Sequence, residues 1–527
     1  MQKKIYLLMI ILSVSISISA QVSNDYKNIC EQSKTESLKP IHPGIYNKQA
    51  FWNENATMFK YVPSFNFSNS SWVITNPKYF LYIAFSFADN QYYKFTADSP
   101  YEPLIPIWDK IPNGKVYLKV EAVNEDESNF VLAGEKQFYK TSVFCPPYER
   151  AKISYKDALL KGLYYVYNQQ HIKDWYEKGK PNHQLHILYC YSALEVGSVI
   201  DAMILYHKYY PDNDSAIVIA KNAADYLIAN SEKKGNYLEY FPQVYEGKNL
   251  TAEKFGDEIL ITQPSFTAQS YLALFEATKE KKYFDAAINI ADTYLKTQLA
   301  NGTWYIRVNK QTGKPASDVL SIPIAIVKFL SVLTDKYQIK KYQHAIDSAV
   351  NWIWDNPMQT YDWTGQFEDV EANKPYQNLT KYEASWFAQF LLNKSSNDSA
   401  NLHYAKELIT FCEDQFVVWE NPDMYDNWGN STKSWRTPSV LEQYKCYVPI
   451  DASSTQMINT FYLAYERTNE KIYREKAIAL ANSLVNSQND DGRIPTFWAA
   501  GFSEFWNNCM VSDLYMLDNL ISKKEIK

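Results

Sequence analysis

The pattern of hydrophobic and polar positions changes its period once along the chain. Between residues 21 and 148, apolar residues alternate with less apolar ones in short runs, as neighbouring side chains of a strand do when they point to opposite faces. The alternating positions of the two clearest runs are Tyr79, Leu81, Ile83, Phe85 and Phe87, and then Val116, Leu118, Val120 and Ala122. This period predicts a small β domain over residues 21–148.

From residue 149 the period becomes helical, and the helical pattern repeats. Residues 276–283 (EATKEKKY) and 466–473 (ERTNEKIY) are identical at five of eight positions, at an offset of 190. In both copies one helix ends, a short polar turn follows and a second helix begins. Second helices starting near residues 155, 215, 283, 342, 404 and 473 predict six helical hairpins, and stacked hairpins can cover their apolar faces by closing into a ring. We therefore expect an (α/α)6 toroid over residues 149–522.

The first twenty residues have the parts of a secretory signal. Lys3 and Lys4 precede an apolar run at residues 5–12, and small residues lead to Ala20. The run is shorter than the ~20 apolar residues of a spanning helix. We expect cleavage near residue 20 to release an exported protein, periplasmic or secreted, without membrane insertion. An uncleaved N-terminal anchor is the alternative.

The six cysteines do not form a metal-binding pattern. None lies in a C-x-x-C pair, so a structural zinc site is not expected. Neither G-x-G-x-x-G nor G-x-x-x-x-G-K-[ST] occurs, and we predict no cofactor. Export permits a disulfide between Cys30 and Cys145, and buried free thiols are the alternative.

Composition narrows the choice of partner. A formal net charge of −6 argues against nucleic acid as a ligand, since nucleic-acid binders normally have a basic face. The 43 Tyr and 14 Trp residues gather in part in the loops between the predicted helices. The oligomeric state is left open by the sequence.

The hairpin signature and the aromatic loops resemble the six-hairpin glycosidase superfamily. Its members include unsaturated glucuronyl hydrolases, family 9 cellulases and toroidal polysaccharide lyases. A β domain before the toroid is similar to the layout of family 9 cellulases, and residues 114–123 resemble a late strand of a fibronectin III or Ig-like sandwich. The resemblance implies a mostly α protein with a small β-sandwich before an (α/α)6 toroid that acts on a polysaccharide or oligosaccharide. It supplies no catalytic motif that transfers residue by residue.

Loops at one end of such a toroid would surround a central cleft. Trp and Tyr can stack on sugar rings, while amides, acids and Arg can bind hydroxyl groups. Loop aromatics that merely plug the core are the alternative for each aromatic position. The expected substrate-binding residues are Trp304, Arg307, Trp363, Gln366, Tyr240, Tyr245, Trp435, Arg436, Glu442, Tyr444 and Tyr447.

Glycoside hydrolysis needs two carboxyl groups, one that donates a proton and one that is ionised. Asp451 begins a predicted helix, where the alternative reading is a capping residue. A lyase would instead use Tyr or His as acid and base, with Arg307 and Arg436 clamping a uronate, and a non-catalytic glycan-binding protein is the third option. The catalytic candidates for hydrolysis, with a uronate-containing chain as one option, are Asp451, Glu368, Asp369, Glu239 and Glu246.

Overall fold

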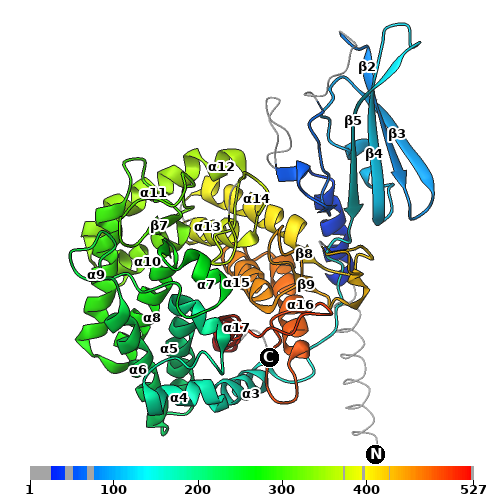
Figure 1. Ribbon diagram of the computed structural model, residues 1–527. Coiled ribbons are helices and arrows are strands. Elements are labelled where there is room, and N and C mark those ends of the chain that lie inside the picture. Colours follow the sequence, from blue (N-terminus) through cyan, green and yellow to red (C-terminus); the bar gives the residue numbers. More distant parts are fainter. Residues whose placement is uncertain are drawn as a thin grey trace, which may run out of the picture.

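The computed structural model describes residues 25–41, 52–67, 76–371, 374–394, 398–426 and 428–523. The predicted signal segment, residues 1–20, lies outside this described part. Figure 1 shows a small β domain standing beside a ring of helices. None of the helices among the described residues is long and apolar enough to span a membrane.

The β domain is built on one five-stranded sheet of order β1-β5-β4-β2-β3, in which β1 runs parallel to β5 and the other pairs are antiparallel. A second sheet stacked on it is not found among the described residues, so the predicted sandwich is not confirmed. The strands are β1 (Met58–Phe59), β2 (Tyr79–Ser86), β3 (Gln91–Ala97), β4 (Gly114–Val123) and β5 (Phe130–Lys140).

The predicted faces are right for one strand and wrong for the other. In β4 the expected alternate residues from Val116 to Ala122 are buried. In β2 the buried residues are the other alternate ones, beginning with Phe80 and Tyr82. Leu81 and the alternate residues on its side of the strand, which were expected to face the core, are half-buried on the outer face. Because β2 is apolar on both faces, its period identifies a strand without choosing the side that faces the core.

The disulfide between Cys30 and Cys145 is present. It ties the helical residues 25–37 to the chain just after β5. The other four cysteines are free.

Six parallel inner helices form a closed ring, because each contacts the next and α17 contacts α5 (Figure 1). This confirms the (α/α)6 arrangement. In chain order, which is also their order around the ring, the inner helices are α5 (Ser192–Tyr209), α8 (Gln263–Thr278), α10 (Ile324–Asp335), α13 (Lys381–Lys394), α15 (Asp451–Thr468) and α17 (Asn507–Ser522).

Each inner helix packs on one outer helix, and the first outer helix, α3, closes the circle by packing on the last inner helix, α17. The outer helices are α3 (Tyr155–Asn168), α6 (Asp214–Asn230), α9 (Lys281–Thr297), α11 (Gln343–Asp355), α14 (Ser399–Phe416) and α16 (Lys471–Ser487). Shorter elements in the connections are α2 (Ile105–Trp108), α4 (Gln170–Lys178), α7 (Leu250–Phe255), α12 (Pro357–Thr360), β6 (Glu258–Leu260), β7 (Arg307–Asn309), β8 (Val417–Val418) and β9 (Ser439–Val440).

The repeated sequence forms two equivalent hairpin turns. Lys279 ends α8 and Asn469 ends α15, both in the left-handed conformation, with φ of 61° and 57°. Tyr283 and Tyr473, four residues further on, are buried at the starts of α9 and α16. The repeat therefore marks the turn between an inner and an outer helix.

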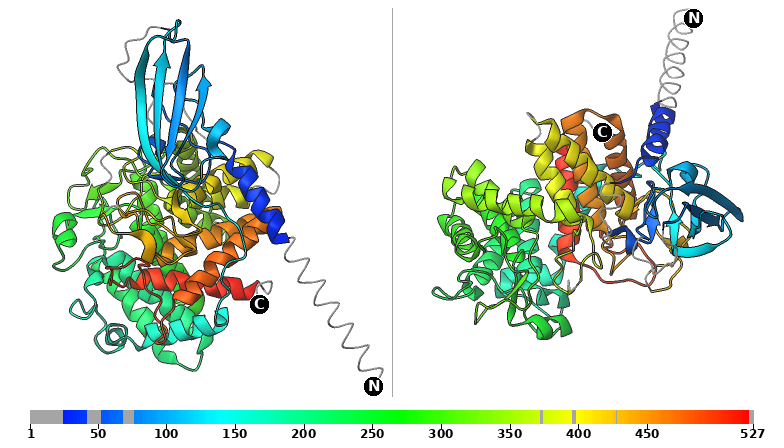
Figure 2. Two further views of the ribbon diagram at one scale, coloured as in Figure 1. Left: turned by 90° about the vertical axis from the view of Figure 1, so that its right-hand side faces the viewer. Right: turned by 90° about the horizontal axis from the view of Figure 1, so that it is seen from above.

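The β domain docks on the end of α14 (Figure 2). The backbone N–H groups of Lys60 and Tyr61 donate to Asp414 Oδ1 at 2.6 and 2.8 Å, and Gln415 donates to the carbonyl of Met58 at 3.1 Å. These buried hydrogen bonds join the chain at and just after β1 to the end of α14, and so they fix the β domain to the toroid.

Candidate functional site

A cavity of about 970 Å³ follows the axis of the ring, and all six inner helices line it. On α15 the lining residues run from Ala452 to Glu466 along one face, which at 1.5 Å per residue spans about 21 Å. A volume of this size is typical of ligand sites. The cavity can therefore hold an elongated ligand lying along the axis.

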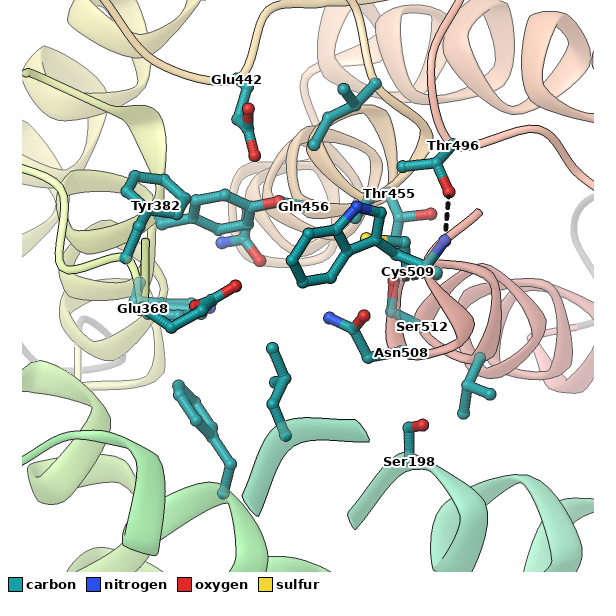
Figure 3. A pocket seen from close by; sticks show the side chains of 18 of the residues that line it. Ser198, Glu368, Tyr382, Glu442, Thr455, Gln456, Thr496, Asn508, Cys509 and Ser512 are labelled. Atoms are coloured by element: carbon teal, nitrogen blue, oxygen red, sulfur yellow. Dashed lines mark hydrogen bonds between the residues drawn. The ribbon is translucent and has the colours of Figure 1, made fainter. Parts of the chain in front are cut away.

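Four carboxyl groups of the lining, including that of Glu504 before α17, come from the connections that lead into the inner helices. Glu368 and Asp369 come from the connection between α12 and α13, and Glu442 comes from the connection between β9 and α15. In Figure 3, Glu368 and Glu442 extend into the cavity from different sides. Two separate loops thus bring carboxyl groups to one space.

The protonation of Glu368, Asp369 and Glu442 depends on their burial and on the charges of the neighbouring carboxyl groups. Burial, then the negative charge of Asp369, raises the pKa of Glu368 to about 8. Burial also raises the pKa of Asp369 and of Glu442, and in the case of Glu442 the ammonium of Lys381 opposes the rise. Glu368 is therefore mainly protonated at pH 7.

Arg307 and Tyr245 hold the backbone that carries Glu368. Arg307 Nη2 donates to the carbonyls of Phe367 and Glu368 at 2.9 and 3.0 Å, and the Tyr245 hydroxyl donates to the Glu368 carbonyl at 2.8 Å. The guanidinium carbon lies 4.0 Å from the ring centre of Phe255 in α7. Arg307 and Tyr245, two of the predicted binding residues, therefore hold the backbone of this loop without lining the cavity themselves.

Lys381 holds the loop that carries Glu442. Its Nζ donates to the Glu442 carbonyl at 3.0 Å and to the Ser453 hydroxyl, and it lies 3.7 Å from the centre of the Tyr382 ring. Burial lowers its pKa to about 7. Its amino group thus joins the start of α13 to the Glu442 loop and to the first turn of α15.

Aromatic side chains line the wall below Glu368. Phe367 contacts Tyr382 with ring centres 6.1 Å apart, Tyr382 contacts Trp386 at 5.5 Å, and Trp386 contacts Phe266 at 5.8 Å. Elsewhere in the lining, Trp506 stacks on a neighbouring tyrosine at 5.2 Å. Flat apolar surfaces beside carboxyl and amide groups suit a ligand such as a sugar, which has both apolar and hydroxyl-bearing faces.

Four of the predicted site residues line this cavity: Gln366, Glu368, Asp369 and Glu442. The other predicted residues lie elsewhere within the described part of the chain, and they are Trp304, Arg307, Trp363, Tyr240, Tyr245, Trp435, Arg436, Tyr444, Tyr447, Glu239, Glu246 and Asp451.

The predicted tryptophans are core residues. Trp304 is 1% exposed and its indole N–H donates to the Tyr294 carbonyl at 3.1 Å, while Trp363 is fully buried against Phe387. Trp435 is also buried. These rings therefore cover the core beneath the loops, which was the alternative interpretation of the loop aromatics.

The tyrosines and the second arginine are also held by the scaffold. Tyr444 and Tyr447 donate to the side-chain and backbone oxygens of Gln415, at 2.7 and 2.8 Å. The backbone N–H of Tyr240 donates to the Glu232 carbonyl, and Arg436 donates to the Asn486 carbonyl at 2.9 Å. None of these contacts turns the side chain toward the cavity.

Two of the predicted acids lie in the connection between α6 and α7. Glu239 accepts from the Gly235 N–H at 2.8 Å and pairs with Lys296 at 3.1 Å. Glu246 accepts from the Tyr226 hydroxyl at 3.2 Å. Both are engaged in local structure and not in the cavity.

Asp451 is the principal correction. It is fully buried at the first residue of α15, where Oδ1 accepts the Ala452 N–H at 2.6 Å. Its carboxyl group pairs with that of Asp513, which also accepts from the Thr455 hydroxyl at 2.6 Å. Burial and the neighbouring carboxyl raise the pKa of Asp451, and burial raises the pKa of Asp513 to about 8. The contacts of Asp451 therefore fit the alternative interpretation, a residue that caps the start of a helix, better than a catalytic role in the cleft.

Several lining residues were missed because they lie on helices. Tyr382 and Trp386 lie one turn apart on α13, and Gln456 and Asn508 lie near the starts of α15 and α17 (Figure 3). The available signal was a polar or large aromatic residue repeated at helical spacing on an otherwise buried helix. Among the described residues, no cluster of three or more His, Cys, Asp or Glu is arranged to hold a metal ion.

No protein-family model matches this sequence, and a comparison with curated proteins gives no match. Several solved structures are similar in fold. A family 76 glycoside hydrolase from a bovine Bacteroides thetaiotaomicron strain is 12% identical, with 86% of this chain and 95% of that chain covered and a TM-score of 0.46. A cellobiose 2-epimerase from Spirochaeta thermophila is 10% identical, with coverage of 69% and 98% and a TM-score of 0.48.

An unsaturated glucuronyl hydrolase from Streptococcus agalactiae is 10% identical, with 72% of this chain and 100% of that chain covered and a TM-score of 0.44. These are similarities of backbone arrangement. The assignment of the ring itself rests on the helix contacts described above.

Proposed function

We propose that this protein binds a carbohydrate chain in the axial cavity and hydrolyses a glycosidic bond, with Glu368 as the general acid and Glu442 as its ionised partner. The observation that carries the proposal is the meeting of these two carboxyl groups, from separate loops, in one cavity beside an aromatic wall.

The protonation states fit this division of work. With a pKa of about 8, Glu368 holds its proton at neutral pH and can give it to the leaving oxygen of the glycosidic bond. Glu442 lies across the cavity on another loop, and in this proposal its ionised form activates water or attacks the sugar carbon. Asp369 keeps Glu368 protonated and adds negative charge near the developing cation.

Elimination finds less support in the cavity lining. The arginines and tyrosines considered for a lyase lie outside the lining among the described residues. Tyr382 does line the cavity, but burial raises its pKa well above 10, which keeps its hydroxyl protonated at neutral pH and leaves almost no tyrosinate to act as a base. Hydrolysis is therefore the reaction that the lining residues favour.

The test is a panel of neutral and acidic polysaccharides, assayed for new reducing ends and for ultraviolet absorbance. The wild type is expected to release reducing ends without absorbance from a C4=C5 double bond. Glu368→Gln should lower the rate by about 10²- to 10⁴-fold, the usual contribution of a general acid. Glu239→Gln is the matched control, because it makes the same change at the outer surface.

Each other outcome has a defined meaning. Absorbance from an unsaturated product would replace hydrolysis with elimination. Binding without any product, unchanged in Glu368→Gln, would indicate a glycan-binding protein. Full hydrolysis by Glu368→Gln would remove this residue from the reaction.

Export is the setting that we propose for this activity. The predicted signal over residues 1–20 supports a periplasmic or secreted enzyme acting on glycans outside the cytoplasm. N-terminal sequencing of the mature protein should begin near Gln21, and an intact Met1 would contradict cleavage.

A further inference from the structure

Lys328 presents an unpartnered ammonium group to the cavity. It is the residue through which α10 lines the cavity, and its Nζ lies 5.0 Å from the centre of the Trp386 ring. No hydrogen bond or ion pair joins it to any residue in the described ranges. Apart from the face of the indole, its charge has no protein partner.

Other enclosed lysines of this molecule do have oxygen partners. Lys60 donates to the Asp414 carbonyl at 2.8 Å, and Lys476 pairs with Glu413 at 2.6 Å. Those lysines are buried, whereas Lys328 is only half-buried and lines the cavity, so a ligand in the cavity can reach its ammonium group. Burial lowers the pKa of Lys328 to about 8, which still leaves it mainly charged at neutral pH.

Two acids that line the cavity on other inner helices are already engaged. Glu383 accepts from Gln366, and Asp201 accepts from the Ser270 hydroxyl at 2.9 Å. Burial raises the pKa of each to about 7, so neither presents a full negative charge in the cavity at neutral pH. The charge of Lys328 therefore remains available to a ligand.

The aromatic wall connects Lys328 to the proposed acid. From Glu368 the wall passes through Phe367, Tyr382 and Trp386, and Lys328 lies over the last of these rings. A sugar chain stacked along the wall would bring the substituents of its inner unit to the ammonium.

We propose that Lys328 binds an anionic substituent, a carboxylate, sulfate or phosphate, on a sugar unit held against Trp386. This rests on the proposed function and narrows its substrate to an acidic oligosaccharide. The site would contribute specificity, because a neutral chain would leave the ammonium unpaired.

The test compares Lys328→Met with Lys341→Met. Lys341 is a matched control because its Nζ also lies 5.0 Å from an aromatic ring, that of Tyr342, but at the surface. The probes are oligogalacturonates, sulfated chondroitin oligosaccharides and phosphorylated mannose oligosaccharides, each paired with its methyl-esterified, desulfated or dephosphorylated form. Binding is measured by calorimetry at pH 7.

For one of the three pairs, the wild type should bind the charged form about 10- to 100-fold more tightly than the neutral form, as expected for a charge-assisted hydrogen bond. Lys328→Met should remove this difference, and Lys341→Met should preserve it. The pair that shows the preference identifies the anionic group.

The failures are distinguishable. If neutral forms bind and are hydrolysed as well as charged ones, the inference is overturned and the proposed hydrolysis stands. If no oligosaccharide binds, both are overturned. Thermal unfolding supplies a second readout, because removing an unpaired charge should leave the melting temperature of the free protein unchanged or higher. A clear fall would indicate a structural lysine and overturn the inference.

Discussion

The most direct prediction concerns the proton on Glu368. Its side chain is only 8% exposed, and burial together with the charge of Asp369 raises its pKa to about 8. At pH 7 a group with this pKa is about 90% protonated, whereas a glutamate of pKa 4.5 would be about 0.3% protonated. The environment therefore supplies the acid form at a pH where an ordinary glutamate has lost it.

The raised pKa also has a cost in stability. An acid whose pKa is higher in the folded state binds its proton more tightly there, so the free energy of unfolding falls as pH rises from about 4.5 to about 8. At pH 7, which is 2.5 pH units above the ordinary glutamate pKa of 4.5, this difference corresponds to about 3 kcal/mol. Glu368→Gln should therefore stabilise the protein by up to that amount at pH 7 and have little effect at pH 4.

The assay is a carbon-13 NMR titration of protein labelled at the glutamate carboxyl carbons, with the Glu368 signal assigned by its loss in Glu368→Gln. Its midpoint should lie near pH 8, and Asp369→Asn should move it to lower pH by removing the neighbouring negative charge. Once a substrate is found, kcat/KM should fall as pH rises through the same midpoint. Glu239→Gln should change neither measurement.

A Glu368 midpoint near pH 4.5 would refute the reasoning, because the group would then be ionised at neutral pH and unable to act as the acid. A midpoint near 8 that Asp369→Asn does not move would leave burial alone as the cause.

Three further predictions test the scaffold. Arg307→Met removes the donors that fix the acid-bearing loop, so kcat/KM should fall about 10- to 100-fold in steady-state kinetics without unfolding; an unchanged rate would contradict a positioning role. Asp451→Asn should keep kcat/KM within about threefold, since its carboxyl does not line the cavity, and a loss as large as that of the acid variant would contradict this placement. Replacing Cys30 and Cys145 with Ser opens a cross-link between residues 115 apart and should lower the free energy of unfolding in urea by about 4 kcal/mol; equal midpoints would contradict it.

The ring could be predicted because its cause is local and repeated. The same polar turn after residues 276 and 466 forces an inner helix to reverse into an outer one, and six such units have only a few ways to cover their apolar faces. The burial side of β2 could not be predicted in this way. Its residues are apolar on both faces, and only the packing of Trp108 and the other core residues decides which side faces inward.

The site was predictable only where loops carry acids. Glu368, Asp369 and Glu442 lie in connections before inner helices, where a ring brings such segments together. Trp304 lies in the core and not in the cavity lining, because a large ring in a loop gains more by packing on the core than by facing water. Trp386 was missed because it lies on a helix. Helical spacing of apolar residues indicates which face of a helix is buried, but it does not show whether that face packs on other side chains or lines a cavity.

The placement of the acids also shows which electrostatic effect dominates at the mouth of the cavity. The inner helices begin there, as the lining positions Gln263, Tyr382 and Ala452 show, and helix N-termini favour negative charge by about 0.3–2 kcal/mol. Alone, that effect would lower the pKa of Glu368. The rise from 4.5 to about 8 corresponds to about 5 kcal/mol in the other direction, so burial and the charge of Asp369 outweigh the helix ends.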